Sequence, residues 1–329
     1  MSSQPKVLVS RNIAQSAIDK LAGVCQVDLN LTPNPLPRAE LLARVKDCQG
    51  LVCLLLDKID DELLTAAPHL KVVSNVAVGF DNFDLATATR HGVMLTNTPG
   101  VLTDTTADFA FTLLMSAARR VAEADRYVRD GKFTEWKLDL FLGQDIHHAT
   151  LGILGLGRIG MGLARRARGF EMKVIYHDEI RAKPDLEKEY GLTFCDRETV
   201  LRESDFVSLH VPLLPSTRHL INAQALGLMK KTAILVNTSR GPVVDEGALA
   251  EALEKGQIAG AGLDVYEYEP KVHPKLMALP NVVLAPHIAS ASVATRTNMA
   301  LLAVENCLAG LAGQTPPNLL NPDVLKNRR

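Results

Sequence analysis

The fold is decided by the stretch Thr150-Leu-Gly-Ile-Leu-Gly155-Leu-Gly157-Arg158-Ile159-Gly160. Its apolar start predicts a buried strand, and the residues after Gly157 predict a helix that continues to Arg168. Gly155 permits a tight turn, Gly157 lets backbone amides approach a pyrophosphate, and Gly160 lets the helix pack closely on the strand. A pyrophosphate is stabilised at a helix N-terminus by unpaired N–H groups and the helix dipole. The stretch therefore predicts a dinucleotide-binding α/β domain.

The choice of dinucleotide depends on the end of the next predicted strand. Asp178 lies 23 residues after Gly155 (178 − 155), where a carboxylate accepts both ribose hydroxyls of NAD. Together with Glu179 it places negative charge where the 2′-phosphate of NADP would lie. NAD(H) is therefore favoured. NADP(H) stays possible because Arg181 or His177 could turn toward the ribose.

Short apolar runs alternate with helical stretches on both sides of this loop. Such alternation predicts α/β architecture with two doubly wound, Rossmann-like parallel sheets. The runs that we interpret as strands are Val7–Val9, Gln26–Leu29, Leu51–Leu55, Val72–Ser74, Val93–Leu95, Thr150–Leu154, Lys173–Tyr176, Phe206–Leu209, Ala233–Val236 and Val282–Ala285.

The domain boundaries follow from the same alternation. We interpret Thr103–Ala118, which follows the turn-forming Thr98-Pro99-Gly100, as a core helix that crosses between domains. The imperfect helical stripe in Thr295–Ala312 suggests that the chain returns to the first domain. The expected domains are residues 1–101 (substrate domain), 102–286 (dinucleotide-binding domain) and 287–329 (return to the discontinuous substrate domain).

Composition excludes several classes of partner. The 36 basic and 37 acidic residues give a net charge of −1, which provides no broad basic face for nucleic acid. The five cysteines lack CxxC spacing, so we expect neither a disulfide framework nor a metal site, and a reducing cytoplasm fits best. The longest apolar run, Leu51–Leu56, is far too short to span a bilayer, and from the first residues we expect no secretion signal.

Six further motifs occur in a fixed order around the glycine loop. They are Val78-Gly79-Phe-Asp81-Asn, Asn97-Thr98-Pro99-Gly100, Thr103–Asp108, Val236–Gly241, Gly262–Val265 with Glu269-Pro270, and Pro286-His287-Ile288. Over essentially the whole chain these motifs resemble the D-isomer-specific 2-hydroxyacid dehydrogenase family, and most of all its glyoxylate/hydroxypyruvate reductases and 2-ketogluconate reductases. The resemblance implies a homodimer that transfers hydride from NAD(P)H to a small 2-keto acid and gives the D-2-hydroxy acid.

Three residues in these motifs suit that reaction. Arg240, just after a predicted strand, has a planar fork that can bind carboxylate and keto oxygens together. His287 can give a proton to the developing alkoxide during reduction and take one back during oxidation. Glu269 would hold the imidazole ring and favour its protonated form. We expect these three residues to be catalytic, with Arg240 and His287 also contacting substrate.

The resemblance also implies roles for other residues. The amides of Val78 and Gly79 would bind the substrate carboxylate, and Leu55 and Ser290 would lie at the substrate. The residues expected at the cofactor, besides Asp178 and the glycine loop, are Thr106 and Asp264 near the nicotinamide and Val211, Pro212 and Thr217 around adenine and its ribose. For Trp136 two alternatives stay open, a place in the pocket or a place in the dimer core.

Two rival functions remain at this stage. One is an NAD(H)-sensing regulator, because a family of corepressors has the same fold and retains the Arg, Glu and His, although this sequence shows no long disordered tail. The other is a methyltransferase-like nucleotide binder, since related glycine loops occur there. That alternative leaves Arg240, Glu269 and His287 without roles.

Overall fold

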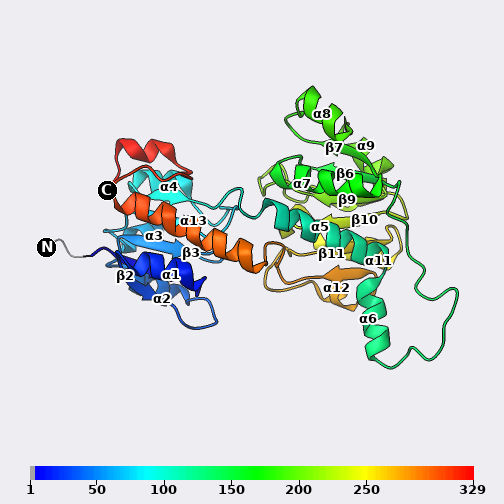
Figure 1. The fold of residues 1–329 in the computed structure, drawn as a ribbon, viewed down its shortest axis with the longest axis horizontal. Coiled ribbons are helices and arrows are strands. Elements are labelled where there is room, and N and C mark those ends of the chain that lie inside the picture. Colours follow the sequence, from blue (N-terminus) through cyan, green and yellow to red (C-terminus); the bar gives the residue numbers. More distant parts are fainter. Residues whose placement is uncertain (1–3) are drawn as a thin grey trace. The chain divides into compact units, whose positions relative to one another are not determined.

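The computed structural model describes residues 4–329, which form two compact α/β units (Figure 1). The first unit contains the described residues up to Leu102 together with Ala291–Arg329, and the second contains Thr103–Ser290. The first unit is thus discontinuous in sequence. The divisions fall at 102/103 and 290/291, where the sequence led us to expect 101/102 and 286/287.

The first unit is built on a five-stranded parallel sheet in the order β2-β1-β3-β4-β5. Its strands are β1 (Lys6–Val9), β2 (Gln26–Leu29), β3 (Gly50–Cys53), β4 (Val72–Asn75) and β5 (Met94–Thr96). The short apolar runs of β1, β3, β4 and β5 are almost completely buried, as expected for parallel strands covered on both faces, whereas the edge strand β2 is only partly buried.

Helices cover both faces of this sheet. They are α1 (Gln15–Ala22), α2 (Arg38–Val45), α3 (Asp61–Ala66), α4 (Leu85–Arg90), α13 (Val293–Leu311) and the short 3-10 helix η3 (Pro322–Lys326). Helix α13 packs on β3, β4 and β5 beside α1, to which Lys20 and Glu305 join it by an ion pair of 2.6 Å (Figure 1). The return of the chain through α13 therefore covers one face of the sheet.

The second unit is built on a seven-stranded parallel sheet in the order β12-β11-β10-β9-β6-β7-β8. Its strands are β6 (Thr150–Leu154), β7 (Lys173–His177), β8 (Leu192–Phe194), β9 (Phe206–Leu209), β10 (Ile234–Asn237), β11 (Gly260–Leu263) and β12 (Val282–Leu284). The chain winds outward from β6 to β8 and then crosses back to β9. The carboxyl ends of β6 and β9 therefore form the switch point at which such sheets bind ligands.

Two hydrophobic cores hold the helices of this unit against its sheet. One core includes α5 (Thr103–Ala118) and α7 (Arg158–Ala167), and the other includes α9 (Arg197–Glu203), α10 (Ala223–Leu228) and α11 (Glu246–Glu254). The remaining elements are α6 (Val121–Arg129), α8 (Pro184–Tyr190), α12 (Pro274–Ala278) and the 3-10 turns η1 (Arg168–Phe170) and η2 (Gly241–Val243).

The predicted fold class, two doubly wound parallel sheets, is confirmed. The segment that we interpreted as a crossing element is α5, which packs on α7, β10 and β11 within the second unit. Strands β8 and β11 were missing from the predicted series. No helix within residues 4–329 has the length and apolar character that a bilayer crossing requires.

Candidate active site

The three predicted catalytic residues all belong to the second unit, at one edge of its sheet. Strands β10, β11 and β12 are consecutive neighbours. Arg240 follows β10, Glu269 lies in the loop after β11, and His287 follows β12. Because these strands are parallel, the loops at their carboxyl ends emerge side by side. The sheet therefore brings together residues from three separate motifs.

His287 and Glu269 form a hydrogen-bonded pair. Nδ1 of His287 lies 2.8 Å from Oε2 of Glu269, and the side chains are 35% and 26% exposed. Because a carboxylate only accepts, Nδ1 carries the proton in this pair. The other ring nitrogen, Nε2, is then the one that can exchange a proton with a ligand.

Glu269 is held in its ionised form by its surroundings. Burial acts to raise the pKa of Glu269, but the hydrogen bond and charge of His287, the amide of Tyr266 and the charge of Arg240 together lower it. Tyr266 donates this backbone hydrogen bond to Oε1 over 2.9 Å. The opposite oxygen of the carboxylate thus stays directed at the imidazole, which fixes the ring.

The turn that carries His287 is anchored by Asp264. His287 has a left-handed backbone with φ of 56°, which is unusual for a residue other than glycine. Its N–H donates to the carbonyl oxygen of Asp264 over 2.9 Å. The next two amides, of Ile288 and Ala289, donate to the Asp264 carboxylate over 2.7 and 2.8 Å. This fully buried Asp therefore holds the turn that carries His287 in place.

Arg240 lies in a turn that side-chain to backbone hydrogen bonds hold in place. Asn237, at the end of β10, donates from Nδ2 to the carbonyl oxygen of Arg240 over 3.0 Å. The guanidinium donates from Nη1 to the carbonyl oxygen of Ser239 over 2.9 Å. The half-buried Arg240 thus places a positive charge at this edge of the sheet, close enough to Glu269 to help lower its pKa.

The glycine loop lies at the switch point between β6 and β9. Gly155 has φ of 94°, and a Cβ placed there would lie 2.8 Å from the backbone carbon of His210. At Gly160 a Cβ would lie 2.3 Å from the carbonyl oxygen of Gly155, whereas at Gly157 it would meet nothing within 4 Å. The loop therefore requires glycine at two positions for packing and exposes its backbone at the third. These residues fit a pyrophosphate at the start of α7.

The matching family model spans residues 111–289 and is described as the NAD-binding domain of D-isomer-specific 2-hydroxyacid dehydrogenases. The chain belongs to this family. The predicted resemblance is therefore confirmed, and the glycine loop and the three residues at the sheet edge all lie within the matched region.

Relatives of this dehydrogenase match it over nearly its whole length. A glyoxylate reductase of Korarchaeum cryptofilum is 53% identical over 328 residues, with 99% of this chain and 98% of the relative covered. A glyoxylate reductase of Thermococcus litoralis is 50% identical, with 98% of each covered. The crystal structure of an NADPH-dependent glyoxylate/hydroxypyruvate reductase of Sinorhizobium meliloti, in complex with NADP and malonate, has a TM-score of 0.86, 33% identity and 99% coverage of both chains.

In this dehydrogenase Asp178 lies directly against the glycine loop. Its carboxylate follows β7 and accepts hydrogen bonds from the amides of Leu156, at 2.6 Å, and Ile180, at 3.1 Å. A carboxylate beside the pyrophosphate loop is where a ribose hydroxyl would be bound. The residues therefore fit a nicotinamide dinucleotide, and Asp178 would contact its adenosine ribose.

Other predicted cofactor residues lie on the same unit. Thr106 is buried in the first turn of α5. Val211 and Pro212 follow β9, and Thr217 donates from its hydroxyl to the carbonyl oxygen of Pro212 over 2.6 Å. Their contacts with cofactor, and the contact of Asp264 with nicotinamide, stay predictions.

Three predicted substrate residues belong to the first unit. Leu55 follows β3, and Val78 and Gly79 follow β4. Asn97 donates to the carbonyl oxygen of Val78 over 2.7 Å, and Asn75 donates to that of Gly79 over 2.9 Å, so this loop is fixed by two asparagines. Ser290 ends the second unit, three residues after His287. Binding of substrate by these four residues stays a prediction.

A second histidine near the switch point is a poor candidate for the acid. His210 follows β9, and its Nε2 lies 2.9 Å from the hydroxyl of Ser208. Burial lowers the pKa of His210 to about 4, so its ring is neutral near pH 7. His287, paired with an ionised carboxylate, is the histidine suited to proton transfer.

Proposed function

We propose that this enzyme reduces a small 2-keto acid, either glyoxylate, hydroxypyruvate or 2-ketogluconate, to the D-2-hydroxy acid with a nicotinamide cofactor. The observation that carries the proposal is the Glu269–His287 hydrogen bond of 2.8 Å, on the same sheet edge as Arg240. Support comes from the relatives named glyoxylate reductase at about half identity over nearly the whole chain. The NAD(H)-sensing regulator has no comparable support.

The chain's residues would divide the work as follows. Arg240 would bind the carboxylate and keto oxygen of the substrate through its fork of donors, which polarises the carbonyl. Protonated His287 would give the Nε2 proton to the oxygen that becomes the alkoxide. Glu269 would balance the charge of the ring before that transfer and keep its orientation. The reduced nicotinamide, when bound, supplies the hydride.

A kinetic panel tests this proposal. We expect the wild-type enzyme to oxidise NADH, followed by its absorbance at 340 nm, with at least one of glyoxylate, hydroxypyruvate and 2-ketogluconate. The ratio of kcat/KM among the three acids then identifies the preferred one. Tight NADH binding without turnover of any of them would favour the regulator instead.

We further propose that NAD(H) is preferred over NADP(H). Arg181, the cation that could have turned toward a 2′-phosphate, is committed elsewhere. It donates to both carboxylate oxygens of Glu187 over 2.8 Å each and lies over the ring of Phe194 at 5.4 Å. The hydrogen bonds from Arg181 and Tyr176 lower the pKa of Glu187 to about 2, so this pair keeps its charges. Arg181 is therefore held away from a 2′-phosphate beside Asp178 and would not neutralise its charge.

The cofactor preference gives a measurable prediction. We expect kcat/KM with NADH to exceed that with NADPH on the order of tenfold or more, because a phosphate near Asp178 meets like charge. Asp178→Ala should bring the two values closer together. Asp185→Ala, which removes an exposed carboxylate from α8, is the matched control and should leave the ratio unchanged. Equal kcat/KM with both cofactors in the wild type would contradict this preference.

We also propose that the enzyme is a homodimer formed through α6 and the segment after it. Helix α6 has no buried residue, and large apolar side chains are exposed along the helix and the segment that follows it. They are Val121, Val128, Phe133, Trp136, Leu138 and Leu142. A group of exposed apolar side chains along one segment is typical of an interface, and a two-fold axis would bury the same residues on both copies.

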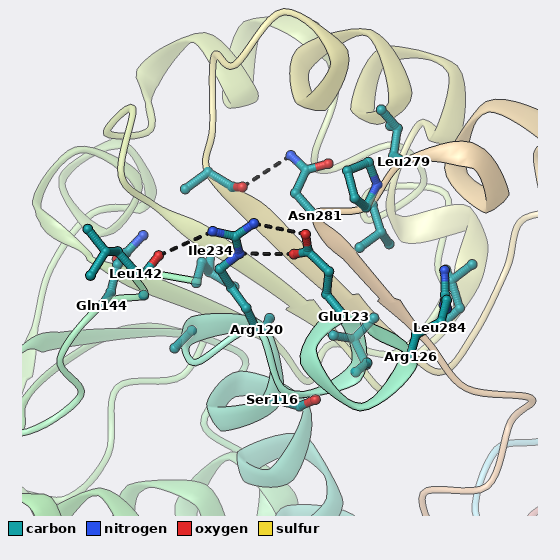
Figure 2. Close-up of a pocket in the computed structure, with 18 of the residues that line it drawn as sticks. Ser116, Arg120, Glu123, Arg126, Leu142, Gln144, Ile234, Leu279, Asn281 and Leu284 are labelled. Carbon is teal, nitrogen blue, oxygen red and sulfur yellow. Dashed lines mark hydrogen bonds and ion pairs between the residues drawn. The ribbon is translucent and has the colours of Figure 1, made fainter. Parts of the chain in front are cut away.

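A pocket beside α6 would accept part of the second copy. Its volume is about 420 Å³, and its walls come from the end of α5, from α6 and from residues 277–284. Figure 2 shows Arg120 reaching between Glu123, with two bonds of 2.9 Å, and the carbonyl oxygen of Leu142. Arg120 thereby ties α6 to the segment that carries Trp136. We place Trp136 in the dimer core.

The dimer proposal predicts a change of mass. By light scattering after size exclusion, the wild type should have twice the 35.7 kDa of the chain. Replacing both Trp136, 76% exposed, and Leu138, 81% exposed, with Ser should yield monomers at micromolar concentration. Leu31→Ser changes an equally exposed leucine in the first unit and should leave the dimer intact. A wild type that runs as a monomer would refute the interface.

We retain the cytoplasm as the proposed compartment, since all five cysteines are free thiols.

A further inference from the structure

Three loops of the second unit meet behind the catalytic residues. They are residues 217–221 before α10, the turn 240–244 after β10, and the loop 264–270 after β11. The second carries Arg240 and the third carries Glu269.

The turn after Arg240 packs directly on the loop before Glu269. A Cβ at Gly241 would lie 1.9 Å from the backbone carbon and oxygen of Tyr266 and 2.4 Å from the amide nitrogen of Glu267. Because Gly241 has no side chain, the two backbones can come into van der Waals contact. Any shift of one loop is transmitted to the other.

Glu267 extends this contact to the third loop. Its side chain is 7% exposed, and Oε1 lies 2.8 Å from Nε2 of His219 and 3.4 Å from Nη2 of Arg218. A carboxylate only accepts, so Nε2 of His219 donates this bond in either protonation state. The backbone N–H of Glu267 donates in turn to the buried carboxylate of Glu246 at the start of α11. Glu267 is thus fixed at both its backbone and its side chain.

His219 closes a ring around the turn. Its backbone N–H donates to the carbonyl oxygen of Pro242 over 2.8 Å, and Pro242 follows Gly241. The ring runs from the Glu267 carboxylate through His219 to Pro242, then through Gly241 back to the loop of Glu267. Arg240 adjoins one member of this ring, and Glu269 is two residues from another. The ring therefore fixes the separation of the cation and the carboxylate.

We propose that Glu267, acting through His219, is a positioning residue that sets the geometry of Arg240 relative to Glu269 and His287. The inference rests on the proposed reduction of a 2-keto acid. Neither residue touches the reacting atoms in this account. Their contribution is to kcat, because a misplacement of about 1 Å at a reacting centre costs on the order of 100-fold in rate.

A pair of substitutions at His219 separates positioning from simple stability. In His219→Gln the side-chain amide can place a donor near the former Nε2, so it should keep most of the activity. His219→Ala removes the donor, and kcat should fall on the order of 10- to 100-fold. The Kd of NADH, measured by fluorescence, should stay within about threefold in both. Equal kcat values for the two variants, or loss of NADH binding in parallel with kcat, would overturn the proposal.

Substitution of Glu267 provides a second test of the positioning role. Glu267→Ala should lower kcat on the same scale at a temperature well below its Tm. Glu254→Ala, which removes the exposed partner of Lys275, is the matched control and should keep wild-type kcat. A folded Glu267→Ala with a lower Tm and wild-type kcat would show a purely structural role. Should Glu267→Ala fail to fold, the His219 pair decides.

Hydrogen exchange distinguishes failure of this inference from failure of the proposed function. If the wild type turns over no 2-keto acid, the proposed function fails. The ring is then tested alone, since backbone amides in residues 240–244 and 264–270 should exchange faster in His219→Ala and at the wild-type rate in His219→Gln. Unchanged exchange in His219→Ala would overturn the ring itself.

Discussion

His287→Ala is expected to lower kcat on the order of 100-fold or more, because the reaction loses its general acid. The structure gives the physical reason. His287 is bonded to an ionised Glu269, and the two amides that follow it donate to Asp264, so its ring is held in a fixed orientation. The effect should appear in kcat with the preferred 2-keto acid, followed through NADH absorbance.

Two comparisons make the result specific. The Kd of NADH should stay within about threefold of wild type, since the substitution leaves the glycine loop and Asp178 intact. His147→Ala removes an exposed histidine from the same unit and should turn over normally. Wild-type kcat in a folded His287→Ala would remove His287 from the mechanism.

Gly241→Ala is expected to be the most destabilising single-methyl change at the site. Its Cβ would lie 1.9 Å from the backbone of Tyr266, and no flexible side chain can move aside to make room. Because the two loops would have to separate, the free energy of unfolding should fall by about 3 kcal/mol or more. Any folded protein should also lose kcat, as Arg240 and Glu269 move apart.

Chemical denaturation and steady-state kinetics would check this expectation. Gly256→Ala is not a suitable control, because its φ of 62° is itself strained for alanine. Gly169→Ala is matched better, since a Cβ there meets nothing within 4 Å. Wild-type stability of Gly241→Ala would show that the turn can relax away from Tyr266, contrary to the ring of contacts around it.

The sequence was sufficient for much of the fold because most strands are apolar runs rich in β-branched residues. Strand β11, Gly260-Ala-Gly-Leu, has the opposite character and was not predicted as a strand. The structure explains its composition. A Cβ at Gly262 would lie 2.9 Å from the Cβ of Leu113 on α5, so glycine allows this helix to pack on the sheet. A local pattern does not contain that tertiary requirement.

The candidate catalytic residues could be proposed from motifs, whereas the groups that hold them in place could not. Asp264 was expected only at the cofactor, yet its carboxylate anchors the turn of His287. Glu246, Glu267 and His219 are separated in sequence and resemble ordinary surface residues there. The burial of Glu246 and Glu267, and the bonds that link them to each other and to His219, arise only when β10 and β11 lie side by side. No spacing rule connects such residues before the fold is known.

We propose that Arg240, Glu269 and His287 together direct the reduction of a 2-keto acid by the reduced nicotinamide, with defined stereochemistry. Reduction of hydroxypyruvate by NADH, followed by chiral analysis of the glycerate formed, tests it most directly. We expect D-glycerate, formed in equal amount to the NADH consumed, with formation on the order of 100-fold slower in His287→Ala. L-glycerate, or no consumption of NADH with hydroxypyruvate, glyoxylate or 2-ketogluconate, would contradict it.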